Sequence, residues 1–237
     1  MSILLKVFKI ENVLVCRIVE RLNRFVVLVY KDGKYYRAHI NNTGRLHEFL
    51  VKDRKAFCLR HLRPYKTDFR LFAVEEHHRG ALIDTQLQMK VFESALEKGI
   101  IPWLEDCRLL KRNARMASSL IDYLLEFQGE NVFLEVKSSV LRENSYAMYP
   151  DCPSLRGQKH IKELTDHVRK GGKAFLLFMA ALPHVTAFKP NRAADPKLFE
   201  LLKKAQKAGV KIKSIGIFFN PKDSLIYLFN PDLKISL

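Results

Sequence analysis

Residues 119–139 read SLIDYLLEFQGENVFLEVKSS, and this stretch decides the fold of the second half of the chain. Two apolar runs flank the polar residues 128–131 (QGEN), which predicts an antiparallel hairpin with a glycine-containing loop. Counting outward from that four-residue loop places Asp122 opposite Lys137. Side chains two positions apart on a strand share a face, so Glu135 lies beside Lys137 and diagonal to Asp122.

Three charged side chains in an otherwise apolar hairpin are costly unless they are paired or bind an ion. Asp122 and Glu135 suit Mg²⁺ (or Mn²⁺), because two carboxylates bind it through oxygen and leave positions for water and a phosphate. Lys137 would then position or deprotonate the attacking water, or stabilise the developing negative charge. The alternative is a plain cross-strand salt bridge between Asp122 and Lys137, with Glu135 in solvent.

Around this hairpin, helical and strand periodicities alternate from about residue 84 onward. The spacing of the apolar residues predicts a helix over 85–98, capped by Asp84 or Thr85 and stopped by Gly99. Further helices are predicted at about 155–170 and 196–208, and strands at 120–127, 132–139, 174–180, 212–219 and 225–229. This order is typical of an α/β (α+β) domain, and we expect a mixed sheet flanked by helices over residues 81–237.

The first 80 residues have a different pattern, with short β-branched and aromatic runs and no long helical period. Lys31-Asp32-Gly33-Lys34 has the Asp-Gly signal of a tight hairpin. We therefore predict a small OB-like β-barrel over residues 1–80 that binds nucleic acid. Arg24 and Arg37 are among the cations that alternate with Phe25, Tyr30, Tyr35 and Tyr36. Exposed aromatics in a basic groove would stack on single strands, although most of these rings are expected in the core.

The charge composition indicates the class of molecule that the protein binds. Lys and Arg total 41 against 25 Asp and Glu, a net charge of +16, and such a surface attracts polyanions. The apolar runs are too short to span a bilayer, and the N-terminus lacks the features of a signal peptide, so a cytoplasmic protein without membrane contact is expected. The four cysteines form no close pair and are expected to be buried free thiols.

A restrained loop, Tyr149-Pro150-Asp151, precedes the basic start of the second predicted helix. Arg156 and Lys159 share a face near the helix N-terminus, where phosphate binds favourably, and Gln158 would orient water or a base. A solvated basic helix end is the alternative for these residues. Asp151 would cap the helix. His160 fits a structural role as well as a catalytic one.

These blocks together resemble a known family. Asp122 followed by Glu135-Val136-Lys137 on the next strand is similar to the PD-(D/E)xK nuclease superfamily. More narrowly, the chain looks like the sugar fermentation stimulation protein A family over nearly its whole length. The matching blocks are Asn42-Thr43-Gly44, Ile121-Asp122-Tyr123, Leu134-Glu135-Val136-Lys137-Ser138, Tyr149-Pro150-Asp151, Arg156-Gly157-Gln158-Lys159-His160 and Glu163-Leu164.

The resemblance implies an N-terminal OB-like domain, a C-terminal nuclease-like domain and DNA as the partner. It also implies that Asp122, Glu135 and Lys137 are the catalytic residues, with the Val136 carbonyl as an extra ligand of the metal. A catalytic Glu on the first helix would be Glu93, with Glu97 as the alternative. The family has Arg where this chain has Leu120, and the nearby cations are Arg112 and Arg115.

Three functions remain open from the sequence. The first is Mg²⁺-dependent hydrolysis of duplex or single-stranded DNA, in which a homodimer would supply the two sites of a symmetric duplex cut. The second is a non-catalytic DNA-binding transcriptional regulator that retains the nuclease fold. Charge alone does not separate DNA from RNA, so RNA processing is a third and weaker reading.

Overall fold

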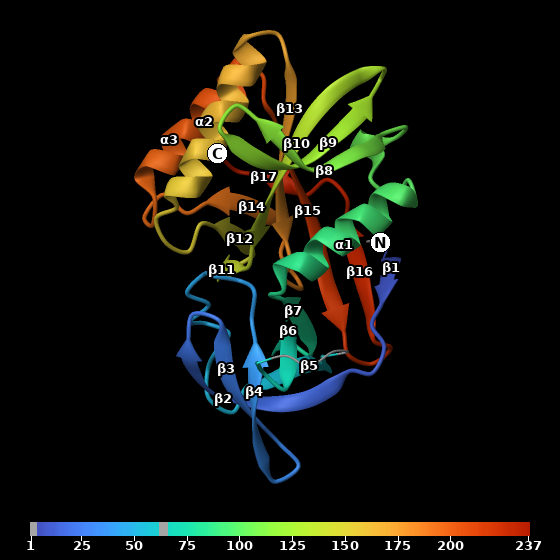
Figure 1. The fold of residues 1–237 in the computed structure, drawn as a ribbon, viewed down its shortest axis with the longest axis vertical. Helices are drawn as coiled ribbons and strands as arrows, with labels where there is room; N and C mark the ends of the chain where they lie inside the picture. Colours follow the sequence, from blue (N-terminus) through green and yellow to red (C-terminus); the bar gives the residue numbers. More distant parts are fainter. Residues whose placement is uncertain (1–3, 62–65) are drawn as a thin grey trace.

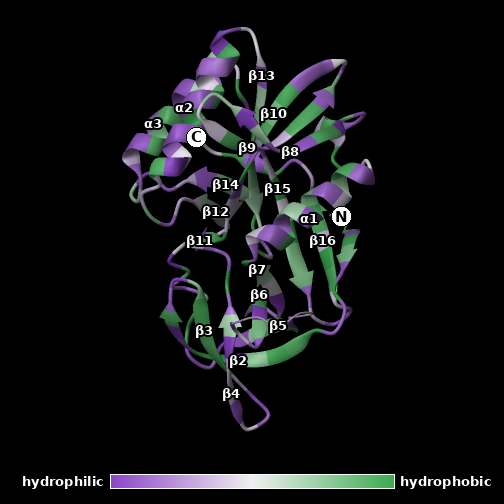
Figure 2. Cartoon of the chain, in the orientation of Figure 1, coloured by the Kyte–Doolittle hydropathy of each residue, from purple (hydrophilic) through white to green (hydrophobic). Residues whose placement is uncertain are grey.

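The computed structural model describes residues 4–61 and 66–237, which form two lobes (Figure 1). The lower lobe is a barrel of five strands, and the upper lobe is a mixed sheet with helices on both faces. Strands with green, apolar faces run through the centre of both lobes (Figure 2). The predicted fold class, an OB-like barrel followed by a helix-flanked mixed sheet, is therefore confirmed.

The barrel consists of β2 (Leu14–Asn23), β3 (Val26–Lys31), β4 (Lys34–His39), β5 (Lys55–Arg60) and β6 (Phe69–Glu76). Its strand order is β4-β3-β2-β5-β6, and a parallel pairing of β4 with β6 closes it. Asp32 and Gly33 form the predicted tight turn between β3 and β4, with φ of 48° and 80°. Inward-facing residues such as Ile18 and Val29 are fully buried, so alternating polarity along the strands fills the interior.

Two strands connect the barrel to the upper lobe. β1 (Leu5–Lys9) precedes the barrel in sequence but pairs with β16 (Leu225–Asn230) of the C-terminal sheet. β7 (Arg79–Leu82) continues from β6 and meets β15 (Lys211–Asn220) where Gly80 lies opposite Phe219. A Cβ at Gly80 would come within 2.9 Å of the Phe219 ring, so the contact requires glycine.

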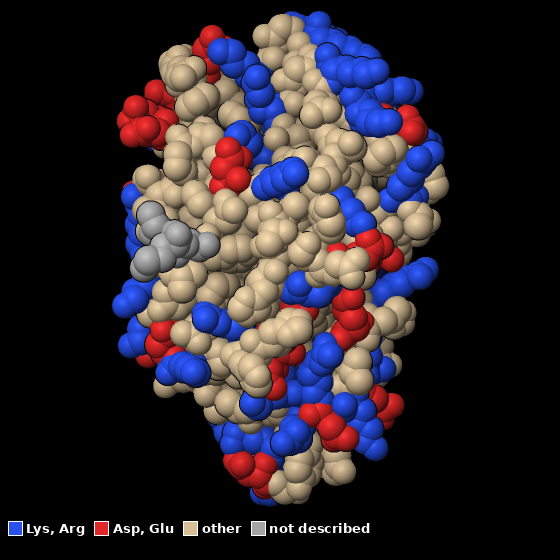
Figure 3. Space-filling view, turned by 180° about the vertical axis from the view of Figure 1, so that it is seen from behind, with Lys and Arg blue, Asp and Glu red and all other residues tan. Residues whose placement is uncertain are grey.

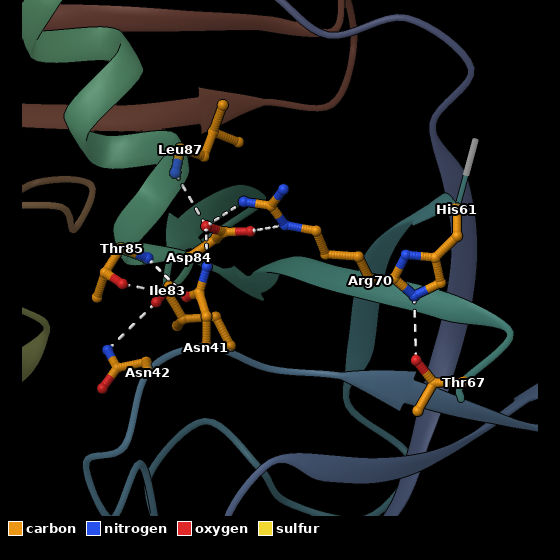
Figure 4. Close-up of polar contacts among 9 residues, drawn as sticks. All are labelled: Asn41, Asn42, His61, Thr67, Arg70, Ile83, Asp84, Thr85 and Leu87. Atoms are coloured by element: carbon orange, nitrogen blue, oxygen red, sulfur yellow. Dashed lines mark hydrogen bonds and ion pairs between the residues drawn. The ribbon is translucent and has the colours of Figure 1, made fainter. Parts of the chain in front are cut away.

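Asp84 fixes the first helix of the upper lobe, α1 (Thr85–Glu97), to the barrel (Figure 4). Its buried carboxylate accepts hydrogen bonds from the Arg70 guanidinium of β6, from Asn41 Nδ2 at 2.6 Å and from the Leu87 backbone N–H at 2.9 Å. The predicted N-cap is confirmed, and the same side chain joins the two lobes.

The upper sheet has the order β8-β9-β10-β13-β15-β16. Its remaining strands are β8 (Arg108–Met116), β9 (Ser119–Phe127), β10 (Glu130–Ser139) and β13 (Lys173–Ala180). β10, β13 and β15 are mutually parallel, because the helices α2 (Leu155–Arg169) and α3 (Pro196–Ala208) make the crossovers between them. β13 is buried from its second residue onward, as expected for a central strand.

The helices lie on opposite faces of this sheet. Gln88 of α1 donates to Ser138 Oγ of β10 at 2.9 Å, whereas His160 of α2 contacts Glu135 of the same strand. Ser138 and Glu135 are three positions apart and so point to opposite faces. No helix in the described ranges 4–61 and 66–237 is long and apolar enough to cross a membrane.

Several short elements were not predicted. β8 (RLLKRNARM) is an edge strand whose many exposed cations hide the alternation. A second sheet contains β11 (Leu141–Glu143), β12 (Tyr146–Tyr149), β14 (Ala187–Pro190) and β17 (Lys234–Ile235), and Pro102–Leu104 form a short 3₁₀ helix. These strands have two to four residues, which is too short for a periodicity to show.

The β9–β10 hairpin has a tighter turn than predicted. Only Gln128 and Gly129 lie outside the strands, with φ of 54° and 75°, so a two-residue turn replaces the expected four-residue loop. Leu134 pairs with Tyr123, which shifts the register by two positions and places Asp122 across from Glu135 instead of Lys137. A shift of two residues keeps every side chain on its predicted face.

The positive φ angles of this turn predict opposite effects on stability for two substitutions. Gly129→Ala is expected to lower the free energy of unfolding by about 1–2 kcal/mol, because an L-residue at positive φ is strained. No atom lies within 4 Å of the new Cβ, so the effect comes from the backbone alone. Gln128→Gly is expected to raise the free energy of unfolding by about 0.5 kcal/mol, because it relieves the same strain. Urea unfolding measures both, and effects of the same sign would contradict the two-residue turn.

Candidate functional site

β9, β10 and α2 bring four polar side chains together between the sheet and the helix. Asp122 comes from β9, Glu135 and Lys137 from β10, and His160 from the buried face of α2. Glu135 is 2% exposed, Lys137 9% and His160 4%. The predicted meeting of Asp122, Glu135 and Lys137 on one face thus occurs in the structure, and His160 joins them.

Glu135 is the centre of the hydrogen-bond network. Its Oε1 accepts from Lys137 Nζ at 2.6 Å and lies 2.5 Å from His160 Nδ1. Its Oε2 accepts from the Asp122 backbone N–H at 3.2 Å. Lys137 therefore forms its salt bridge with Glu135, and the cross-strand bridge to Asp122 considered as an alternative does not form.

The two strands separate at this point, which explains the position of the carboxylates. The β9–β10 ladder ends at Leu134 opposite Tyr123, while β10 continues along β13. The backbone N–H groups of Asp122 and Val136 lie just beyond the end of the ladder. Each donates instead to a carboxylate across the gap, Val136 to Asp122 Oδ2 at 2.8 Å. The acidic side chains thus replace two ladder hydrogen bonds where the strands diverge.

The environment moves the ionisation of the two acids in opposite directions. Burial, and then the nearby charge of Glu135, raise the pKa of Asp122 to about 6. Burial also acts on Glu135, but Lys137 and His160 outweigh it and lower the pKa of Glu135 to about 2. Lys137 is buried too, yet the Glu135 carboxylate raises its pKa above the ordinary value. Lys137 is therefore protonated at neutral pH.

The donor set fits a divalent cation. No described residue donates a hydrogen bond to Asp122 Oδ1. Burial and the charge of Glu135 outweigh the opposing effects of Lys137 and His160 and raise the pKa of Asp122, so an anion there is only partly compensated. Two carboxylate oxygens with further water ligands are a normal set for Mg²⁺. The described residues contain no cluster of three or more His, Cys, Asp or Glu suited to a metal, so backbone or water oxygens would complete the coordination. The Val136 carbonyl as a ligand remains a prediction.

Glu93 is not brought to this cluster. Its carboxylate accepts two hydrogen bonds from Arg112, both at 2.7 Å, and one from the Tyr123 hydroxyl at 2.9 Å. Tyr123 is the neighbour of Asp122 on β9 and points to the opposite face, against α1. In this structure Glu93 therefore belongs to a salt bridge on the far side of the sheet, and Glu97 is exposed.

The predicted nucleic-acid contacts separate into two groups. Five of the cations are exposed, namely Arg24, Arg37, Arg115, Arg156 and Lys159. Gln158 is 9% exposed and donates to both carboxylate oxygens of Asp195, at 3.0 and 3.1 Å. Its amide holds α2 to the start of α3, so it is not positioned to orient a water or a base as predicted.

Arg24 and Arg156 face the same cavity. We call it the interlobe cavity: about 480 Å³ between the barrel and the upper lobe. Its walls come from the blocks Asn42-Thr43-Gly44 and Tyr149-Pro150-Asp151, from Ser138 at the end of β10 and from the start of α2. Motifs more than 100 residues apart in sequence thus line one space.

Asp151 joins the two walls and does not cap α2 as predicted. Its carboxylate accepts the Arg45 backbone N–H, whereas Ser154 caps the helix by accepting from the Gly157 N–H at 3.1 Å. A Cβ at Gly44 would lie 2.4 Å from Asp151 Oδ2, so the approach requires glycine. The sequence pattern contained both blocks without indicating that they touch.

The barrel aromatics are more exposed than expected. Phe25, Tyr30 and Tyr35 are 47%, 39% and 66% exposed, and the expectation that most of these rings lie in the core is wrong. Only Tyr36 packs inward, with its ring 4.7 Å from that of Phe69. Tyr30 and Tyr35 contact each other across the β3–β4 pair, 5.3 Å between ring centroids. Of the cysteines, Cys16 and Cys58 are buried and Cys107 and Cys152 partly exposed, all as free thiols.

Positive charge concentrates on the helical side of the upper lobe. Figure 3 shows Lys and Arg gathered at the upper right of the rear view, the side on which Figure 1 places α2 and α3. The exposed cations of these helices and their ends are Arg156, Lys159, Lys162, Arg169, Lys170, Lys197, Lys203, Lys204 and Lys207. This surface covers the face of the sheet that holds Asp122 and Glu135.

Two family models match the chain. The model described as SfsA N-terminal OB domain matches residues 19–83, and that described as Sugar fermentation stimulation protein RE domain matches residues 86–223. A sugar fermentation stimulation protein homolog of Pyrococcus furiosus is 46% identical over 223 residues, covering 94% of this chain and 96% of the relative. The homolog of Archaeoglobus fulgidus is 45% identical over 232 residues, covering 98% and 99%.

A solved structure shows the same fold. The structure of Pyrococcus furiosus SfsA in complex with Ca²⁺ superposes with a TM-score of 0.94 at 43% identity and covers 98% of this chain and 100% of that one. The barrel and the sheet thus form a fold already known for the P. furiosus relative. The chain belongs to the sugar fermentation stimulation protein (SfsA) family.

Proposed function

We propose that the protein is a DNA-binding nuclease that hydrolyses phosphodiester bonds with Mg²⁺ or Mn²⁺ held by Asp122 and Glu135. The observation that carries the proposal is the pair of acids where β9 and β10 separate, in which the pKa of Asp122 is raised to about 6. A purely structural salt bridge between Glu135 and Lys137 does not need a second carboxylate, and burial and the charge of Glu135 make ionised Asp122 energetically unfavourable. The structure of the P. furiosus relative in complex with Ca²⁺ supports divalent-metal binding by this family.

Each side chain has a role that follows from its contacts. A bound Mg²⁺ or Mn²⁺ supplies polarisation of a phosphoryl oxygen and a lower pKa for bound water. Lys137, kept protonated by Glu135, stabilises negative charge that develops on the phosphate, so the alternative role as general base is disfavoured. His160 positions the Glu135 carboxylate through the contact at Oε1.

A second candidate is a DNA-binding regulator without catalysis. The observation that favours it is that Glu135 already has protein partners on both oxygens, so most of the cluster is satisfied without a metal. The exposed cations around α2 would bind DNA phosphates in either case. We favour the nuclease because the regulator leaves Asp122 unexplained.

The test is a cleavage assay on plasmid, linear duplex, single-stranded DNA and RNA, with EDTA, Mg²⁺ or Mn²⁺. We expect cutting of DNA that requires the metal and disappears in both Asp122→Ala and Lys137→Ala. Retained DNA binding without cutting of any substrate would favour the regulator, and preferential cutting of RNA would assign the third function. The offset between cuts on the two duplex strands shows whether a homodimer acts.

A further inference from the structure

The interlobe cavity is a preformed space. Asp151 connects its two walls by accepting the Arg45 backbone N–H. Arg21 fixes the barrel wall, because its guanidinium donates to the carbonyls of Gly44 at 2.8 Å and Arg45 at 2.6 Å, and to that of Arg24 at 2.8 Å. A side chain that makes so many backbone contacts holds both barrel loops in place, so the cavity does not require a ligand to form.

Two cations flank this space from opposite lobes. Arg24 belongs to the barrel loop after β2, and Arg156 is the second residue of α2. Both are exposed, and neither forms a salt bridge with a carboxylate of the described chain. The Asp151 carboxylate also lines the cavity, but one of its oxygens accepts a hydrogen bond from the Arg45 backbone N–H. Guanidinium groups without anionic partners are suited to phosphate.

The rest of the lining is suited to a base. Met148, Tyr149 and Leu155 contribute apolar and aromatic surface, and Leu155 is 79% exposed, an unusual position for a leucine. A base has an apolar face that stacks on such groups and a polar edge that needs hydrogen bonds. Thr43 in the opposite wall offers a hydroxyl group for that edge, whereas the Asn42 amide is already bonded to the Ile83 carbonyl and the Gly44 N–H.

The size of the cavity excludes a base pair. A volume of about 480 Å³ suits one small molecule or one nucleotide. A stacked base pair within a duplex cannot enter it, whereas an unpaired or extruded base can.

The cavity also lies beside the acidic cluster. Ser138, which follows Lys137 on β10, is part of its wall. Tyr149 lines the cavity with its hydroxyl 3.4 Å from Ser154 Oγ, at the start of the helix that carries His160. Tyr149 also lies near Lys137 of the cluster, so a strand with one nucleotide in the cavity would carry a neighbouring phosphate toward the cluster.

From these contacts we infer that the interlobe cavity receives one unpaired nucleotide of a DNA strand, with Arg24 and Arg156 holding the phosphates on either side. The inference rests on the proposed function and names its substrate class: single strands, and duplexes with unpaired or frayed ends. A closed duplex without unpaired nucleotides is then a poor substrate.

Binding of labelled oligonucleotides in EDTA tests this without cleavage. The probes are a thymidine 12-mer with one central 2-aminopurine and a blunt, GC-rich 12-base-pair duplex that has no loop. Fluorescence anisotropy measures both affinities. We expect at least about tenfold preference for the single strand, in line with stacking of one base, and a change in 2-aminopurine emission on binding. Thr43→Trp, which fills the cavity, is expected to remove the preference and the emission change.

Arg24→Ala and Arg156→Ala give a second measurement that does not depend on filling the cavity. Each is expected to weaken single-strand binding by about tenfold and duplex binding by much less. Lys222→Ala removes an exposed cation of the turn between β15 and β16 and is the charge-matched control, with a small and equal effect on both probes. Circular dichroism melting establishes that each variant is folded.

The outcomes separate this inference from the proposed function. Equal affinity for the two probes, or a preference that survives in folded Thr43→Trp, would overturn the inference while metal-dependent cutting of DNA still stood. Failure of the wild-type protein to bind either probe would overturn both. Preference for the single strand that is lost in Thr43→Trp and weakened in the two Arg variants would support it.

Discussion

Asp122→Asn is expected to remove cleavage and at the same time to stabilise the protein. The variant loses an anionic ligand of the metal, and we expect the rate to fall by at least about 10³-fold, within the range that single active-site groups supply. The amide oxygen still accepts the Val136 N–H, so the hydrogen bond at the strand separation survives. What disappears is a partly buried charge that faces Glu135.

The gain in stability depends on pH with a definite sign. The pKa of Asp122 rises from 3.8 to about 6 on folding, so the folded state binds this proton more tightly than the unfolded state. Below pH 4 both states are protonated and the variant has no advantage. Between pH 4 and 6 the advantage grows, and above pH 6 it reaches about 1–3 kcal/mol, from about 1.4 kcal/mol per pKa unit.

Urea unfolding in EDTA at pH 4 and pH 8 measures this difference. Glu126→Gln is the matched control, because Glu126 lies on the same strand but pairs with Arg108 at the surface, and its effect should be close to zero. Addition of Mn²⁺ should then stabilise the wild-type protein and leave Asp122→Asn unchanged, because only the native site binds the ion. A variant no more stable than wild type at pH 8 would show that Asp122 is not held in an unfavourable state.

Glu135→Gln is expected to have the opposite effect on stability. Glu135 is the anion between Lys137 and His160 inside the protein, and its removal leaves a buried ammonium group without a counter-charge. Loss of one partner of a buried ion pair costs about 3–5 kcal/mol. Cleavage should be lost as well, because the same residue is the second proposed metal ligand.

A double variant separates the ion pair from simple loss of packing. Glu135→Gln combined with Lys137→Met should recover most of the lost stability, since the ammonium group and its salt-bridge partner are then removed together. Glu93→Gln provides a control on the other face of the sheet, where the partner Arg112 is 62% exposed and the cost should be at most about 1 kcal/mol. A Glu135→Gln variant that unfolds like wild type would show that the cluster is solvated.

Glu93→Gln also tests the remaining catalytic prediction. Its carboxylate is joined to Arg112 and Tyr123 on the α1 side of the sheet, so we expect the variant to cut DNA at the wild-type rate. A large loss of cleavage in a folded Glu93→Gln protein would place this residue in the catalytic machinery after all.

Much of the fold could be predicted because local sequence determines it. The helices α1, α2 and α3 and the strands of the central sheet lie within one or two residues of their predicted positions, since apolar periodicity and capping residues act over a few positions. The face shared by Asp122, Glu135 and Lys137 was predictable for the same reason, because side chains alternate along every strand. The register was off by two positions, because the positive φ of Gln128 allowed a shorter turn than the residue type suggested.

Hydrogen-bond partners that are far apart in sequence could not be predicted from local sequence patterns. Gln158 binds Asp195, Asp151 binds the backbone of Arg45, and His160 binds Glu135, and each of these contacts depends on how whole elements pack. The sequence by itself determined the elements, the charge and the acidic pair, because these follow from local pattern and composition. Only the tertiary structure decided which charged and polar side chains pair with one another, because burial and hydrogen-bond geometry are properties of the packed chain. The most important of these features is the separation of β9 from β10, which brings Asp122 beside Glu135 without a salt bridge of its own.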